Sequence, residues 1–124
     1  MQSNRPVFLD LWRIKLPATG IVSILHRISG VLMVLAIPAA AILLHLALSG
    51  PEGFQAAAGF LGNGLVRLAL LVLAWSLLHH LFAGLRYLLL DLGIGLDRAV
   101  ARQSAWTTIL SALAVLVIGL GVIL

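Results

Sequence analysis

Residues 68–91 read LALLVLAWSLLHHLFAGLRYLLLD, and this stretch indicates both the class of protein and the place to look for chemistry. Its first 18 residues, Leu68 to Leu85, contain no Asp, Glu, Lys or Arg. A helix of about 20 mostly apolar residues crosses the hydrocarbon core of a bilayer, so the stretch predicts a transmembrane helix. Ionisable side chains near or within a span are costly, and His79 and His80 therefore mark a candidate functional site.

The composition extends this conclusion to the whole chain of 124 residues. Hydrophobic residues make up 62% of it, charged residues make up 10%, and the mean hydropathy is +1.16. A soluble domain averages about 45–50% apolar and about 25% charged residues. The chain has no cysteine, which excludes disulfides, thiolate metal sites and iron–sulfur ligation by its own side chains. We therefore expect an integral membrane protein whose surface meets membrane lipid.

Two further apolar stretches complete the predicted fold, which is an all-α integral membrane protein with three transmembrane helices. The first has no Asp, Glu, Lys or Arg from Ile28 to Pro51, and Pro38 is expected to kink it. A polar loop is expected from Ser49 to about Gly64. The expected single membrane domain, 1–124, consists of a cytoplasmic N-terminal segment at 1–18 and transmembrane helices at about 20–48, 64–91 and 104–124.

The basic residues predict how the helices are oriented. Arg67 stands alone on one side of the membrane, whereas seven basic residues fall on the other side: Arg5, Arg13, Lys15, Arg27, Arg86, Arg98 and Arg102. By the positive-inside rule the N-terminus is cytoplasmic and the C-terminus lies outside. This topological distribution accounts for the formal charge of +4, so nucleic acid is not an expected partner.

The first group of candidate residues lies at the start of the first span. In a helix Ser23, His26, Arg27 and Gly30 occupy positions i, i+3, i+4 and i+7, which share one face. A hydroxyl, an imidazole and a guanidinium on one face can bind a polar head such as a quinone carbonyl or a carboxylate. The alternative is structural, with the arginine reaching the lipid headgroups and the serine bonded to its own helix.

The second group is the histidine pair in the second span. Adjacent helical residues point about 100° apart, so His79 and His80 cannot both ligate one metal ion. His80 shares a face with Gly84, and a haem between helices takes one axial imidazole from a helix whose small residues admit the porphyrin. Arg27 and Arg86 should lie near the cytoplasmic surface, where guanidinium groups can neutralise haem propionates. Alternatively, the histidines only form hydrogen bonds across a helix interface.

These residues leave two readings open besides a haem shared with another chain. The first is an electron carrier complete in one chain, a b-type cytochrome with His26 and His80 as its two axial ligands. The second is a non-redox membrane scaffold whose histidines only pack.

Three motifs suggest a family. They are Arg5-Pro6, the Ser-x-x-His-Arg-x-Ser-Gly pattern from Ser23 to Gly30, and the His-x-x-x-Gly-x-Arg-x-x-x-x-Asp pattern from His80 to Asp91. With these motifs and three spans, the chain resembles the cytochrome b membrane-anchor subunit of succinate dehydrogenase (succinate:quinone oxidoreductase, respiratory complex II). It departs from that pattern at Tyr87, where many relatives have histidine, and at His79, where an aromatic residue is common.

The resemblance implies that the three helices pack with three from a second hydrophobic anchor subunit and that a haem b lies between the two. It implies His80 as an axial ligand of the haem iron, Ser23 and Arg27 as quinone-binding residues, and His26 beside the haem propionates. Electrons would come from succinate through flavin and iron–sulfur clusters on a flavoprotein subunit and an iron–sulfur subunit. Ubiquinone would be the substrate at a bacterial inner membrane, in the respiratory chain and tricarboxylic acid cycle. No residue of this chain alone would catalyse succinate oxidation.

Overall fold

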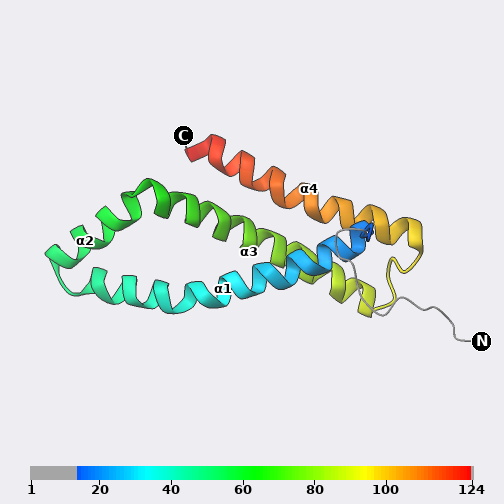
Figure 1. The fold of residues 1–124 in the computed structure, drawn as a ribbon, viewed down its shortest axis with the longest axis horizontal. Helices are drawn as coiled ribbons and strands as arrows, with labels where there is room; N and C mark the ends of the chain where they lie inside the picture. Colours follow the sequence, from blue (N-terminus) through cyan, green and yellow to red (C-terminus); the bar gives the residue numbers. More distant parts are fainter. Residues whose placement is uncertain (1–13, 124) are drawn as a thin grey trace, which may run out of the picture.

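The computed structural model describes residues 14–123, and all regular structure within them is helical. Figure 1 shows four helices: α1 (Ala18–Leu48), α2 (Pro51–Gly62), α3 (Gly64–Asp91) and α4 (Arg98–Ile123). Most of the expected cytoplasmic segment, including Arg5-Pro6 and Arg13, lies outside the described residues, as does Leu124.

Helix α1 has 31 residues and begins directly after Pro17. The Pro17 carbonyl accepts hydrogen bonds from the backbone N–H groups of Gly20 and Ile21, at 2.9 and 3.1 Å, which satisfies part of the first helical turn. Pro38 lies inside the helix, which remains one continuous element from Ala18 to Leu48. Pro38 therefore does not end the helix, and the expected kink stays a prediction.

The segment expected to be a loop between the first two spans is largely helical, so that expectation was wrong. Gly50 has a φ of 127°, a left-handed value that lets the chain reverse after α1. Pro51 then occupies the first turn of α2, where its fixed φ and missing N–H suit a helix start. The Gly50 carbonyl accepts from the Phe54 N–H at 2.9 Å. Glycine and proline here end one helix and begin another.

The connection between α3 and α4 is a short turn with two glycines in the left-handed region, Gly93 and Gly95, both at φ 80°. Helix α4 begins at Arg98, earlier than the expected start near residue 104. The Asp97 carbonyl accepts from the Ala101 N–H at 2.8 Å, so the charged residues of this region already lie in the helix. Helix α4 extends on its N-terminal side beyond the uncharged run because arginine is a good helix former.

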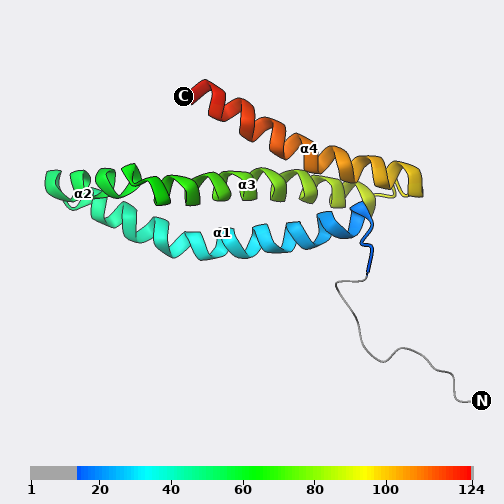
Figure 2. The same cartoon turned by 45° about the horizontal axis from the view of Figure 1, so that its top comes forward.

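Helix α3 is central and packs against both α1 and α4. The start of α1, the end of α3 and the start of α4 lie together, whereas α2 lies at the opposite end and α4 diverges from α3 towards the C-terminus (Figures 1 and 2). The residues buried between the helices are small, as in the cluster Ala18, Val22, Ala83 and Ala105. Small side chains let transmembrane helices approach closely.

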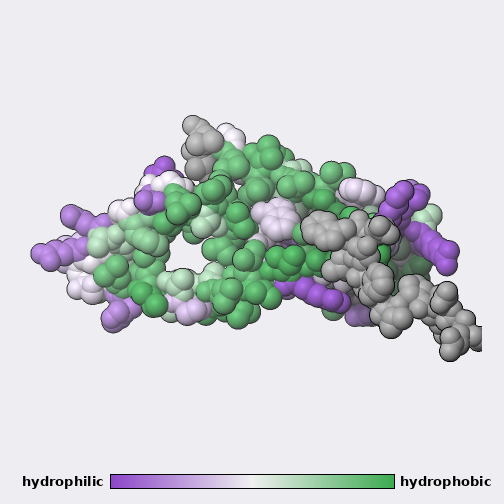
Figure 3. Space-filling model, viewed as in Figure 1, coloured by the Kyte–Doolittle hydropathy of each residue, from purple (hydrophilic) through white to green (hydrophobic). Residues whose placement is uncertain are grey.

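The outer surface exposes many large apolar side chains, which suits contact with lipid and not with water. Three helices, α1, α3 and α4, are long and apolar enough to cross a membrane. In Figure 3 the hydrophobic surface fills the middle of the molecule and the hydrophilic surface lies mainly at its two ends. The expected fold class, an all-α membrane protein with three spans, is thus confirmed, while the direction in which it crosses the membrane stays a prediction.

The first turn of α3 depends on a side-chain cap at Asn63, whose Oδ1 accepts from the N–H groups of Leu65 and Val66 at 2.9 and 3.4 Å. We predict that Asn63→Ala lowers the free energy of unfolding by about 1 kcal/mol, because the N–H groups lose their acceptor. Detergent-induced unfolding followed by circular dichroism measures it. Exposed Gln55→Ala should change the value by less than about 0.5 kcal/mol, and equal effects would contradict the cap.

Candidate functional site

Two histidines from different helices meet where α1 and α3 cross. The rings of His26 and His80 are stacked, with centroids 4.0 Å apart and an interplanar angle of 16°. Each ring lies against a glycine of the opposite helix. A Cβ atom at Gly30 would lie 3.1 Å from His80 Cε1, and one at Gly84 would lie 3.7 Å from His26 Nε2. The two glycines therefore provide the space that brings both imidazoles between the helices.

The hydrogen bonds of His80 define which of its ring nitrogens carries the proton. Its Nδ1 lies 3.1 Å from the backbone carbonyl oxygen of His26 and 3.2 Å from the Ser29 hydroxyl. That hydroxyl donates to the same His26 carbonyl at 2.8 Å. Because a carbonyl can only accept, we assign the proton to Nδ1, which leaves the lone pair on Nε2. A metal-ligating histidine typically has this arrangement, with its other nitrogen held by a carbonyl.

His79 has a different environment, although it is the next residue. It is fully buried among the helices and stacks on Trp75, with centroids 5.2 Å apart and an interplanar angle of 18°. Neither of its ring nitrogens has a hydrogen-bond partner among the described residues, although the backbone of Val22 is nearby. His80, by contrast, is only half-buried. A ligand approaching from outside the helices can reach His80 but not His79.

The two candidate quinone-binding residues flank His26 on α1, with Ser23 three residues before it and Arg27 directly after it. Ser23 is half-buried and Arg27 is exposed. The hydrogen bonds within the described part of the chain engage neither side chain. Within residues 14–123 both polar groups are therefore without a hydrogen bond, and they can bind a ligand or a second chain.

Tyr87 and Ser29 contact the two stacked histidines, and the sequence did not predict either contact. The Tyr87 ring packs edge-on against His26, with centroids 5.3 Å apart and an interplanar angle of 69°. Its buried hydroxyl has no hydrogen-bond partner within residues 14–123. Ser29 is fully buried and supports His80. The spacing of three residues between His26 and Ser29 was a usable signal, because it places both on one side of the helix.

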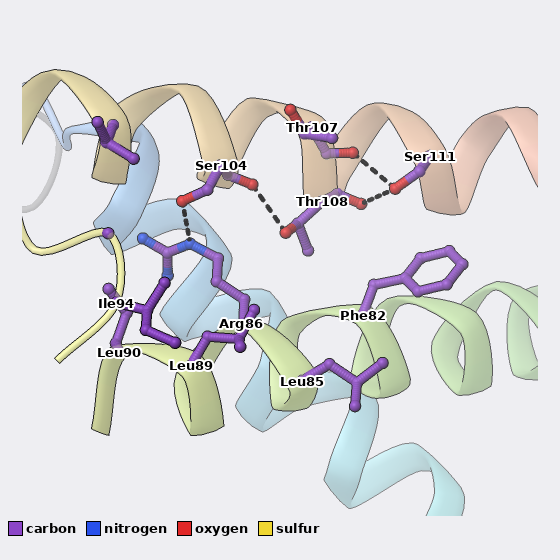
Figure 4. Close-up of a pocket in the computed structure, with 12 residues that line it drawn as sticks. Phe82, Leu85, Arg86, Leu89, Leu90, Ile94, Ser104, Thr107, Thr108 and Ser111 are labelled. Carbon is purple, nitrogen blue, oxygen red and sulfur yellow. Dashed lines mark hydrogen bonds between the residues drawn. The ribbon is translucent and has the colours of Figure 1, made fainter. Parts of the chain in front are cut away.

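Arg86 reaches α4, and its guanidinium carbon also lies 5.5 Å from the centroid of the Tyr87 ring. Its Nε donates to the Ser104 hydroxyl at 2.9 Å, and its Nη2 donates to the Ala101 carbonyl at 3.0 Å. Figure 4 shows the guanidinium reaching across to α4 at Ser104. On α3 it shares the buried face with His79 and Ala83, whereas His80 faces α1. No sequence pattern predicts the Arg86–Ser104 contact, which joins two helices.

Comparison with known proteins assigns the chain to a family. The model of the succinate dehydrogenase/fumarate reductase transmembrane subunit family matches residues 1–120. The chain belongs to this family. Two relatives are each named succinate dehydrogenase cytochrome b556 subunit. The protein from Coxiella burnetii is 39% identical, covering 96% of this chain and 97% of the relative. The protein from Paracoccus denitrificans is 33% identical, covering 96% of this chain and 92% of the relative.

The family assignment agrees with the resemblance inferred from the motifs. The matched region contains the whole histidine stack, both glycines and the α1 face with Ser23 and Arg27. This member of the succinate dehydrogenase/fumarate reductase transmembrane subunits thus places its polar side chains at one crossing of two helices. Membership makes the chain a membrane subunit of an oxidoreductase complex.

The crossing can be tested through the space at Gly30. We predict that Gly30→Leu lowers the free energy of unfolding by about 1–3 kcal/mol, because the added side chain meets the His80 ring. Gly119 is the matched control, since nothing lies within 4 Å of its Cβ position. Detergent-induced unfolding of Gly30→Leu and Gly119→Leu in parallel gives the comparison. A loss at residue 119 equal to that at residue 30 would contradict the close packing of His80 on α1.

Proposed function

We propose that this chain is the haem b-binding membrane anchor of a succinate:quinone oxidoreductase and forms part of its ubiquinone site. The observation that carries the proposal is the placement of His80, with Nδ1 on a backbone carbonyl and its ring half-buried beside Gly30. The cytochrome b556 name of the two relatives points to the same group.

The residues at the crossing fit a haem. The Nε2 lone pair of His80 would suit a bond to the haem iron, and the His26 ring occupies the space beside Gly84. We assign the propionate environment to His26 and Arg27. Arg86 is predicted to belong there too, and its guanidinium also donates to Ser104 and Ala101 on α4. When bound, the haem supplies one-electron redox chemistry next to the quinone site.

The stacking of His26 on His80 argues against a haem held by this chain alone. Axial ligands lie on opposite faces of a porphyrin, which must separate their rings. Two rings with centroids 4.0 Å apart are in direct contact and leave no room for a macrocycle between them. The second axial histidine would therefore come from a second hydrophobic anchor subunit, and the haem would be shared between the two anchors.

Ser23 and Arg27 would hold the quinone on the α1 side of the site. The Ser23 hydroxyl would donate to a quinone oxygen, and the Arg27 guanidinium would stabilise negative charge as the ring is reduced. Protons would come from water or neighbouring subunits. Electrons from succinate would arrive through the flavin and iron–sulfur clusters of two peripheral subunits, so that this chain contributes to quinone reduction and not to succinate oxidation.

The location follows from the same proposal. The cluster of basic residues at the start of α1 and the α3–α4 turn would face the cytoplasm of a bacterium, with the protein in the inner membrane. Peripheral subunits would then bind on the cytoplasmic side, at the end where α1 begins and α3 ends. The quinone site would lie at that end too.

The haem ligand is tested with two adjacent variants of the co-purified complex. We predict that His80→Leu abolishes the reduced-minus-oxidised haem absorbance, because it removes the iron ligand. His79→Leu is the matched control and should retain it, since the buried ring has no accessible lone pair on the outer side. A normal spectrum for His80→Leu would overturn the assignment, and a wild-type complex without haem would favour a scaffold.

The quinone role is tested at Arg27. A charge-assisted hydrogen bond contributes about 1.5–3 kcal/mol, so Arg27→Leu should slow ubiquinone reduction by about tenfold to hundredfold. Succinate oxidation with an artificial acceptor that reacts at the flavin should be unchanged. Arg67→Leu, at the opposite end of the spans, is the charge-matched control and should leave both activities intact. Loss of both activities in Arg27→Leu would count against a quinone-site role.

A further inference from the structure

A groove of about 420 Å³ lies between the end of α3, the following turn and α4, and its size is that of a ligand site. One wall is apolar and comes from α3 and the turn, with Phe82, Leu85, Leu89 and Ile94. The other wall comes from α4 and includes Thr107 and Ser111 (Figure 4). The Thr107 and Ser111 hydroxyls donate to carbonyls of their own helix. Their protons are therefore already engaged, and this wall does not need a hydrogen-bond acceptor from a ligand.

The floor of the groove holds the guanidinium of Arg86, which is only 7% exposed. Both of its hydrogen bonds go to neutral oxygens, the Ser104 hydroxyl and the Ala101 carbonyl. No carboxylate is among the described residues that line the groove. A positive charge removed from water is costly unless an anion compensates it, and in a membrane span the cost rises further. The Tyr87 ring, 5.5 Å from the guanidinium carbon, is an uncharged partner, so Arg86 lacks a negative counter-charge among the described residues that line this groove.

The depth of Arg86 suits a lipid phosphate. It lies five residues before Asp91, the last residue of α3, which is about 7.5 Å along the helix axis. Arginines at this depth reach the headgroup region, where the anions of a membrane are concentrated. Leu85 and Phe82 continue the groove from Arg86 towards the interior of the bilayer, where an acyl chain runs.

We propose that this groove binds one anionic phospholipid. Its phosphate accepts hydrogen bonds from Arg86, and one acyl chain packs along Phe82 and Leu85 against α4. The positive charge of Arg86 favours an anionic ligand. A quinone has a hydrogen-bond acceptor and an apolar tail, but it carries no negative charge to balance the guanidinium. The groove is formed by α3 and α4, whereas the proposed quinone residues lie on α1, and Tyr87 lies between Arg86 and the His26 ring.

Native mass spectrometry of the co-purified complex, incubated with phosphatidylglycerol or phosphatidylcholine, tests the proposal. Wild type should retain phosphatidylglycerol at least about tenfold more than phosphatidylcholine, because only the former carries net negative charge. Arg86→Gln should reduce that retention about tenfold. Arg102→Gln is the matched control: it removes an exposed arginine at the same end that does not line the groove, and it should leave the retention unchanged.

A second variant separates the lipid site from a folding defect. Thr107→Phe leaves the Arg86 hydrogen bonds intact and fills the groove from its open side, so it should also reduce phosphatidylglycerol retention. Wild-type retention in Thr107→Phe would overturn the proposal even if Arg86→Gln failed to assemble. Equal retention of the two lipids by wild type would overturn it too. So would a loss of bound ubiquinone, with phosphatidylglycerol unaffected, in Arg86→Gln.

Discussion

The imidazole of His80 sits in a notch that Gly30 leaves on the opposite helix, and its Nδ1 reaches the carbonyl of His26. This contact determines how closely α1 and α3 approach and how the His80 ring is turned. It also places the polar α1 residues beside the crossing. A longer side chain at Gly30 would displace the ring, so the geometry of the whole site depends on a missing methyl group.

The rest of the structure lacks the large apolar core that would hold a soluble protein together. Its buried residues are mainly alanines and a few polar side chains, while leucines, isoleucines and valines cover the outside. Because lipid is as apolar as leucine, burying large side chains gains little in a membrane, and close packing and hydrogen bonds between helices matter more. The His80–His26 and Arg86–Ser104 contacts are of this kind. The apolar exterior is then surface for lipid and for a second anchor subunit.

The sequence predicted the three spans because each uncharged run, as a helix, is about as long as the hydrocarbon core of a bilayer is thick. Helical periodicity also predicted that His79 and His80 point to different sides, and the structure has one buried and the other half-exposed. The sequence does not predict helix α2 because glycine and proline commonly end helices, although proline also begins them. The contact of Arg86 with α4 was not predicted for a different reason: periodicity gives the face of a helix but not which neighbouring helix meets that face. The roles of the site residues remain predictions.

Iron ligation by His80 can be measured through the reduction potential of the haem in the complex that contains His80→Met. Methionine in place of an axial histidine raises the potential of a haem, so a ligand at residue 80 predicts a clear positive shift. His79→Met, which changes a buried ring on another face of α3, should leave the potential where it is in wild type. An unchanged potential and spectrum in His80→Met would contradict the central claim that Nε2 of His80 binds the iron.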